Sequence, residues 1–206
     1  MEKRKLGNSD LLISPLTFGG NVFGWTIDEE KSFKLLDAFF ASNFNFVDTA
    51  DGYSRWVPGN HGGESETIIG NWMKKRGHRK GMIIATKVGA DMGNGKKGLK
   101  VNYIKEAAES SLKRLQTDYI DLYQSHHDDL DTPVSETMTA FNELIDEGKV
   151  RYIGASNLSA ERIKESNDFA RKNNLQPYIR LRPLYYLYGR EKFENAYRKL
   201  AADEGL

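Results

Sequence analysis

Four side chains that can donate, accept or hold a proton stand at or just beyond the ends of predicted β-strands. Asp48 and Tyr53 follow the strand-like run 44–48, Lys87 follows IIAT, and His126 follows IDLYQS. Because the carboxyl ends of parallel strands converge on one face of a barrel, we expect the four side chains to lie close together. Such a cluster suits carbonyl reduction, in which an acid protonates the oxygen as a hydride arrives.

Each residue type has a role in that chemistry. A tyrosine hydroxyl is a weak acid near neutral pH, and an ammonium beside it stabilises the phenolate left after proton transfer. Lys87 can supply the ammonium, and Asp48 can hold it in place. His126 can donate a hydrogen bond that orients the substrate oxygen. Taken singly, each residue also fits an ordinary structural role, such as a turn cap, a loop aromatic or a solvated charge.

The composition is that of one globular domain without an extreme charge. The 206 residues include 39% hydrophobic ones, enough to fill one core, so we predict a single domain over residues 1–206. The formal net charge of +1 attracts neither nucleic acid nor an acidic membrane. Cysteine is absent, which excludes disulfides and thiolate metal sites. No secretory signal and no apolar run of roughly 20 residues is found, so we expect a cytoplasmic protein without a membrane partner.

Strand-like and helix-like segments alternate along the chain after a small hairpin predicted at residues 3–13. We predict strands at 16–20, 44–48, 82–86, 119–123, 150–153 and 178–181, and helices beginning after Asp28 and at 64–75, 101–115, 133–147, 159–172 and 191–204. Parallel strands need crossover connections, so this alternation predicts a parallel sheet covered by helices. An open dinucleotide-binding sheet normally carries G-x-G-x-x-G after its first strand, and FGGNVFG at 18–24 lacks that spacing. A closed barrel is therefore favoured.

The stretches that carry these residues resemble the aldo-keto reductase family, in the bacterial branch related to potassium-channel β-subunits. The matching stretches are LTFGGNVFGW (16–25), NFVDTADGYS (45–54), GGESETIIGNWMKKRG (62–77), IIATKVG (83–89), SLKRLQTDYIDLYQSHHDD (111–129) and GKVRYIGASN (148–157). They cover nearly the whole chain in the family's order.

The resemblance implies a TIM-type (β/α)8 barrel that uses NADPH to reduce aldehydes or ketones to alcohols. It implies that the catalytic tetrad is Asp48, Tyr53, Lys87 and His126, with Tyr53 as the proton donor. The positions expected to bind the cofactor are Gly20, Asn21, Asp48, Ser156, Asn157 and Arg182. Trp25 and Trp56 are expected to line the substrate pocket.

Two departures from the family pattern stand out. Arg182 replaces a glutamine that contacts the nicotinamide carboxamide, and Tyr186 replaces an asparagine. A guanidinium has only donors, so it cannot accept the amide hydrogen as a glutamine oxygen does. The second departure is that only about six of the eight βα units are found, so we expect the last two to be lacking and the barrel edges to be open.

Three hypotheses for function remain. The first is an NADP-dependent reductase of a small carbonyl substrate. The second is a truncated, non-catalytic barrel fragment or interaction module that self-associates through its open edges. The third is Schiff-base chemistry at Lys87, as in a lyase. We expect no metal at His126-His127-Asp128-Asp129, because adjacent side chains on a strand point to opposite faces.

Overall fold

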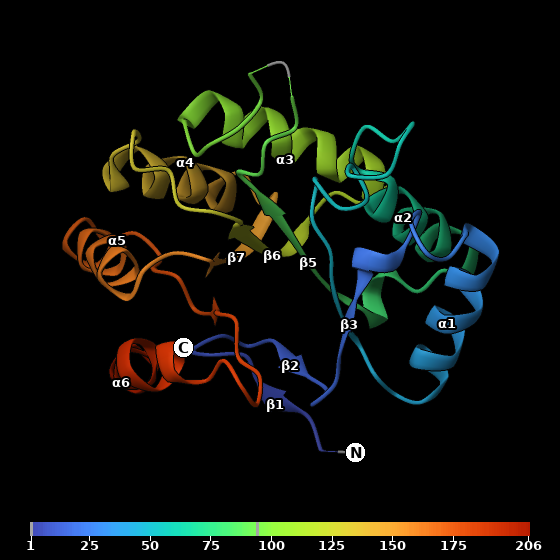
Figure 1. The fold of residues 1–206 in the computed structure, drawn as a ribbon, viewed down its shortest axis with the longest axis horizontal. Coiled ribbons are helices and arrows are strands. Elements are labelled where there is room, and N and C mark those ends of the chain that lie inside the picture. Colours follow the sequence, from blue (N-terminus) through green and yellow to red (C-terminus); the bar gives the residue numbers. More distant parts are fainter. Residues whose placement is uncertain (1, 94) are drawn as a thin grey trace.

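The parallel sheet predicted from the alternation is present in the computed structural model, which describes residues 2–93 and 95–206. Six parallel strands lie in the order of the sequence: β3 (Thr17–Gly19), β4 (Phe46–Asp48), β5 (Ile83–Val88), β6 (Ile120–Ser125), β7 (Val150–Ser156) and β8 (Leu181–Arg182). The sheet curls, and the helices form an arc around its outer side (Figure 1). The described chain is thus a half-barrel of the predicted type.

The helices of the outer layer connect consecutive strands. They are α1 (Glu29–Ala41), α2 (Glu64–Arg76), α3 (Val101–Leu115), α4 (Val134–Asp146) and α5 (Ala160–Lys172). Two of them begin at the predicted capping residues. The Asp28 carboxylate accepts a hydrogen bond from the Lys31 amide at 2.9 Å, and the Ser159 hydroxyl accepts one from the Arg162 amide at 3.1 Å. These bonds satisfy backbone donors that a helix start leaves unpaired.

Successive strand residues face opposite sides of the sheet, and this alternation decides what lies inside the barrel. Val47 and Ile84 belong to the larger core cluster between the sheet and the helices. Phe46, Ile83 and Ala85 belong to the smaller cluster on the inner face. Asp48, two residues after Phe46, therefore faces the barrel interior.

The predicted hairpin, β1 (Arg4–Lys5) and β2 (Leu12–Ile13), packs beneath the inner face of the sheet. Its turn residues Leu6 and Leu11 are buried in the same cluster as Ile179. Gly7 has φ +51°, and a Cβ there would lie 2.0 Å from the Ile179 carbonyl oxygen. Only glycine fits this contact, which seats the hairpin against the sixth strand.

Two elements near residue 206 differ from prediction. The strand predicted at 178–181 is regular only at Leu181–Arg182, although Ile179 and Arg180 already exchange backbone hydrogen bonds with β7 at 3.0 and 2.9 Å. The helix predicted at 191–204 contains a π-helical turn, Phe193–Tyr197, before α6 (Arg198–Glu204). The buried Tyr197 ends that turn and donates a hydrogen bond to the Leu158 carbonyl at 2.7 Å. Local periodicity does not report this tertiary contact.

Helices α2 and α3 approach closely at Gly70. A Cβ there would lie 2.2 Å from the Arg114 carbonyl oxygen, so any larger residue would push the helices apart. Across the described ranges, no helix combines the length and the apolar character needed to cross a membrane.

Candidate active site

The Lys87 ammonium joins three of the four predicted catalytic positions. Its Nζ donates hydrogen bonds to Asp48 Oδ2 at 2.7 Å, to the Thr49 carbonyl at 2.6 Å and to the Tyr53 hydroxyl oxygen at 2.8 Å. The side chains of Lys87 and Asp48 are almost completely buried. The geometry expected of a proton donor beside an ammonium is therefore present.

Strand register explains how residues so far apart in sequence meet. Asp48 is aligned with Ala85 in the parallel pair of β4 and β5. Lys87 lies two residues beyond Ala85 on the same inner face, so its side chain reaches Asp48. Because β5 extends to Val88, Lys87 lies within the strand and not after it, as the prediction of 82–86 implied. Tyr53 lies in the turn that follows β4.

His126 directly follows β6 and completes the predicted set. Its ring meets the Tyr53 ring edge-to-face, with 5.8 Å between the ring centroids. The Asn157 amide donates a hydrogen bond to the His126 carbonyl at 2.8 Å and fixes this segment. Burial, aided by the Lys87 charge, lowers the pKa of His126 to about 3. The imidazole is therefore neutral at neutral pH, and its buried Nδ1 has no partner among the described residues.

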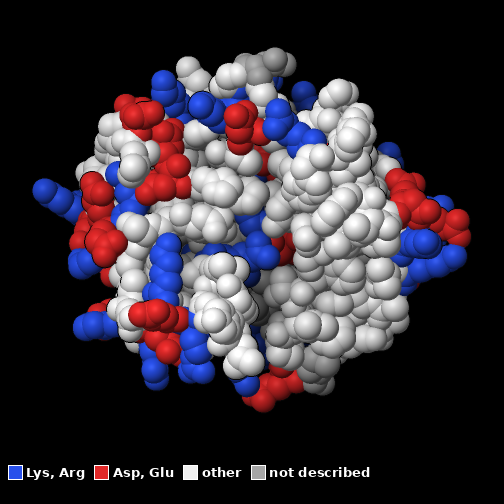
Figure 2. Space-filling model, in the orientation of Figure 1, with Lys and Arg blue, Asp and Glu red and all other residues white. Residues whose placement is uncertain are grey.

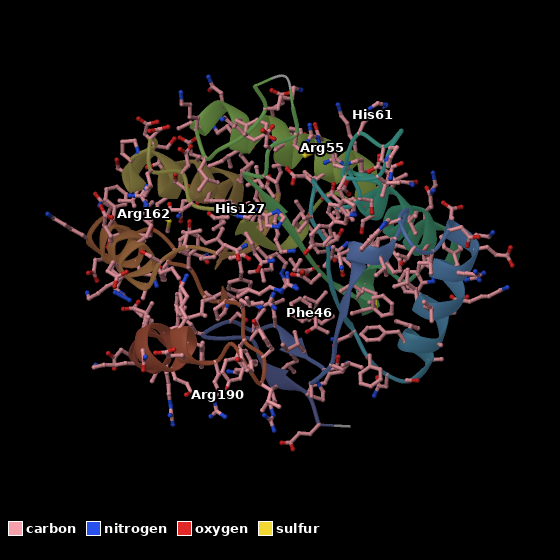
Figure 3. The ribbon with its side chains drawn as sticks, in the orientation of Figure 1. Phe46, Arg55, His61, His127, Arg162 and Arg190 are labelled. Carbon is pink, nitrogen blue, oxygen red and sulfur yellow. The ribbon has the colours of Figure 1, made fainter. Side chains whose placement is uncertain are left out.

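His126 and His127 do not point to opposite faces as we expected. Their rings stack with 4.7 Å between centroids and 13° between planes. Side chains alternate between faces only within a strand, and both histidines lie beyond Ser125, where β6 ends. In Figure 3, His127 lies towards the middle of the molecule.

Two arginines from the sixth strand also enter the site. Arg182 Nη1 lies 2.9 Å from Asp48 Oδ2 and donates a hydrogen bond to the Tyr53 hydroxyl at 3.2 Å. Arg180 Nη1 lies 3.5 Å from Asp48 Oδ1, with its guanidinium 5.0 Å from the Phe46 ring centroid. Figure 2 shows basic side chains at the bottom of the hollow near the centre of this face.

Arg180 and Gln124 also belong to the site, although neither was predicted from the sequence. The buried Gln124 amide donates a hydrogen bond to Asp48 Oδ1 at 3.1 Å, and its carbonyl accepts one from Arg180 at 3.3 Å. The alternation of a strand could have indicated both residues, because side chains two positions apart lie on the same face. Gln124 precedes His126 by two positions, and Arg180 precedes Arg182 by two.

Asp48 is ionised although it is buried. Burial acts to raise its pKa, but the charges of Lys87, Arg182 and Arg180 outweigh that effect and hold the pKa below its usual value. One carboxylate therefore holds three cations, and two of them, Lys87 and Arg182, contact the Tyr53 hydroxyl.

The predicted pocket aromatics lie beside this cluster. The Trp56 ring is 6.3 Å from the Tyr53 ring, and the Trp25 ring is 5.5 Å from the Trp56 ring. Both tryptophans are about half exposed. A cavity lined by Tyr53, Trp56 and His126 opens at this place.

The remaining predicted cofactor positions lie at the same ends of neighbouring strands. Gly20 is buried, and a Cβ there would lie 2.8 Å from the Ser65 hydroxyl, whereas Asn21 is exposed. At the end of β7, the Ser156 hydroxyl accepts a hydrogen bond from the Asn157 amide at 3.2 Å. Asn157 is exposed and has φ +57°. Hydroxyl and amide groups of this kind fit a carboxamide such as that of nicotinamide.

A second buried acid, Asp51, lies in the turn that carries Tyr53, two residues before it. Both carboxylate oxygens of Asp51 are buried and lack a hydrogen-bond partner among the described residues. Burial, followed by the nearby Glu66 charge, raises the pKa of Asp51 to about 7. Glu66 itself accepts hydrogen bonds from Arg114 at 2.6 Å and from Thr86. This cluster was not predicted, because its residues come from the turn after β4, from α2, from β5 and from α3.

The chain belongs to the Aldo/keto reductase family, which it matches over residues 15–206. The members of this family are (β/α)8 barrels, and the six-stranded half-barrel with a hairpin described above is part of that fold.

Three curated relatives show what the chain is similar to. The uncharacterised oxidoreductase YqkF of Bacillus subtilis is 40% identical over 179 residues, which cover 85% of this chain and 54% of YqkF. Norsolorinic acid reductase B of Aspergillus parasiticus is 34% identical over 96% of this chain and 52% of its own length. A probable voltage-gated potassium channel subunit beta of rice (Oryza sativa subsp. japonica) is 35% identical over 100% of this chain and 62% of its own length. The chain thus spans between half and two thirds of these relatives.

Proposed function

We propose that the chain carries the reactive centre of an NADPH-dependent reductase that converts an aldehyde or ketone to an alcohol, with Tyr53 as the proton donor. The observation that carries this proposal is the hydrogen bond of 2.8 Å from the Lys87 ammonium to the Tyr53 hydroxyl oxygen. Lys87 is itself held by Asp48 at 2.7 Å.

The hydrogen-bond directions support proton donation by Tyr53. Its oxygen accepts hydrogen bonds from Lys87 and from Arg182, which use both lone pairs. Its own hydrogen is then left to donate to a substrate carbonyl oxygen. When the proton leaves, two cations face the new phenolate and stabilise it. The neutral His126 ring can hold the substrate oxygen without adding a charge.

Residues at the ends of β3 and β7 would hold the cofactor. Ser156 and Asn157 would bind the nicotinamide carboxamide, and Gly20 and Asn21 would lie beside the ring. A reduced nicotinamide supplies a hydride when it is bound. The residues of this chain orient the carbonyl, exclude water from Lys87 and deliver the proton.

The Schiff-base hypothesis is less well supported. A lysine attacks a carbonyl as the free amine, and three acceptors around the Lys87 Nζ stabilise the ammonium. Lys87 is also fully buried, with Tyr53 between it and the cavity.

The test is oxidation of NADPH, followed by its absorbance, with aromatic and aliphatic aldehydes and the intact chain. We expect turnover that Tyr53→Phe abolishes. Fluorescence of the bound cofactor measures binding separately. Failure of the chain to bind NADPH at millimolar concentration would contradict the proposal for this chain. Borohydride trapping that depends on Lys87 would favour the Schiff-base alternative.

A further inference from the structure

The charges around Asp48 do not balance. Lys87, Arg180 and Arg182 all lie within 3.5 Å of its carboxylate oxygens. No other carboxylate in the described part of the chain forms an ion pair with any of the three. With Tyr53 and His126 neutral, the site holds two positive charges in excess. An excess of partly buried positive charge favours a ligand of opposite sign.

The two arginines differ in what they offer such a ligand. The Arg180 side chain is 15% exposed, and its Nη1 is engaged by Asp48 and Gln124. The Arg182 side chain is 41% exposed. Within the described residues, Arg182 uses only Nη1 for its contacts to Asp48 and Tyr53. Its Nε and Nη2 donors therefore remain for a ligand. Arg180 is held by Asp48 and Gln124, whereas Arg182 is exposed enough for a ligand to reach it.

The position of Arg182 determines how far an anionic group bound to it can lie from a carbonyl that accepts the Tyr53 proton. Its Nη1 is 3.2 Å from the Tyr53 hydroxyl. A carbonyl oxygen that accepts the Tyr53 proton would lie about 2.7 Å from that same hydroxyl. The guanidinium and the carbonyl oxygen are then near neighbours, so an anionic group next to the carbonyl reaches both. A guanidinium binds a carboxylate with two parallel hydrogen bonds, which fixes the orientation as well as the affinity.

We infer that Arg182 binds the carboxylate of the substrate, and that the substrates are 2-oxo acids. This inference rests on the proposed reduction at Tyr53 and names its substrate class. The carbonyl carbon gains a hydride from the reduced nicotinamide, and the oxygen gains the Tyr53 proton. Solvent then returns a proton to the phenolate. NADPH is oxidised as the 2-oxo acid becomes a 2-hydroxy acid.

The test compares phenylglyoxylate with its neutral methyl ester, which keeps the 2-oxo group but lacks the carboxylate charge. Isothermal titration calorimetry of the intact chain without cofactor measures both affinities, and inorganic phosphate serves as a second anion. We expect phenylglyoxylate to bind at least about 10-fold tighter than the ester, as a charge-assisted pair provides. Added salt should reduce the difference.

Variants of Arg182 assign the effect. Arg182→Gln should bring the acid to the affinity of the ester, and Arg182→Lys should keep part of the difference because it keeps the charge. Arg190→Gln is the matched control, since Arg190 is 53% exposed, pairs with Glu194 and lies near the edge of the molecule in Figure 3. This control should leave both affinities unchanged. Circular dichroism shows whether each variant is folded.

Two results would overturn the inference. One is equal binding of the acid and the ester. The other is phosphate binding as tight as that of phenylglyoxylate and equally dependent on Arg182, which would make Arg182 a general anion site such as one for a cofactor phosphate. Turnover of neutral aldehydes without discrimination would leave the reductase proposal intact. Discrimination in binding without any turnover would refute the reductase proposal and the substrate assignment that rests on it, and would leave Arg182 only as a carboxylate-binding residue.

Discussion

The Lys87 ammonium and the Tyr53 hydroxyl lie 2.8 Å apart although 34 positions separate them in the sequence. The contact exists because β5 brings Lys87 to the end of β4, where the chain turns back towards it. The Thr49 carbonyl, one residue beyond β4, binds the same ammonium at 2.6 Å. The turn after β4 is therefore tied to β5 at the hydroxyl that we propose as the proton donor.

Removing the Tyr53 hydroxyl should abolish turnover without affecting the fold. Tyr53→Phe should lower kcat by about 100-fold or more, which is the usual contribution of a positioned acid. Affinity for NADPH should change little, because the phenyl ring still packs against Trp56 and His126. Steady-state NADPH oxidation and fluorescence titration check the two parts. Tyr152→Phe, whose hydroxyl binds Asp10 elsewhere in the molecule, is the control and should retain full activity.

Neutralising Asp48 should destabilise the protein. Asp48→Asn leaves three cations facing one another, and breaking a buried ion pair in this way costs about 3–5 kcal/mol. The free energy of unfolding in urea measures the loss. Glu30→Gln breaks an ion pair with Lys34 in which both side chains are exposed, and it should leave the urea midpoint unchanged. Equal effects of the two substitutions would mean that Asp48 does not organise the site.

His126 should make the protein less stable in acid. Burial lowers its pKa from 6.5 to about 3, so the unfolded chain takes up the proton first as the pH falls. The free energy of unfolding should therefore decrease from pH 6.5 towards pH 3. His126→Gln lacks this contribution and should show a flatter dependence over that range. Nuclear magnetic resonance of the wild-type ring should show no titration between pH 5 and 7, and a transition near 6.5 would contradict the buried, neutral state.

Asp51 should act in the opposite direction. Burial raises its pKa from 3.8 to about 7, so the folded chain keeps a proton that the unfolded chain loses first. Its contribution to stability should fall as the pH rises from about 4 to about 7 and stay low above that. Asp51→Asn should therefore be more stable than wild type at pH 8 and nearly equal to it at pH 3. Asp146→Asn on the exposed side of α4 is the control, and urea unfolding at both pH values is the measurement.

Hydrophobic periodicity and capping residues predicted the helices from short stretches of sequence. The helix Val101–Leu115 has the predicted bounds, and Asp28 and Ser159 cap the helices expected of them. Residue types and strand ends also indicated Asp48, Tyr53, Lys87 and His126 as one cluster, and the structure brings them together.

The rest depends on tertiary contacts that periodicity does not record. Arg180 is placed by its approach to Asp48 and to the Phe46 ring. The acid cluster of Asp51 and Glu66 depends on how α2 lies against the sheet. The π-helical turn before α6 accompanies the burial of one aromatic side chain, Tyr197. Each of these involves partners distant in sequence, which a window of neighbouring residues does not contain.

Gly70, at the contact between α2 and α3, connects the packing of the helical layer with the candidate site. The absence of a side chain lets α2 rest on the last turn of α3, and Glu66, one helical turn earlier, meets Arg114 as a result. The Glu66 charge, after burial, raises the pKa of Asp51, which lies in the turn that carries Tyr53. The spacing of two outer helices thus bears on the environment of the buried turn that carries Tyr53. A larger side chain at position 70 would separate α2 from α3 and would thereby disturb the buried Asp51, two residues before Tyr53.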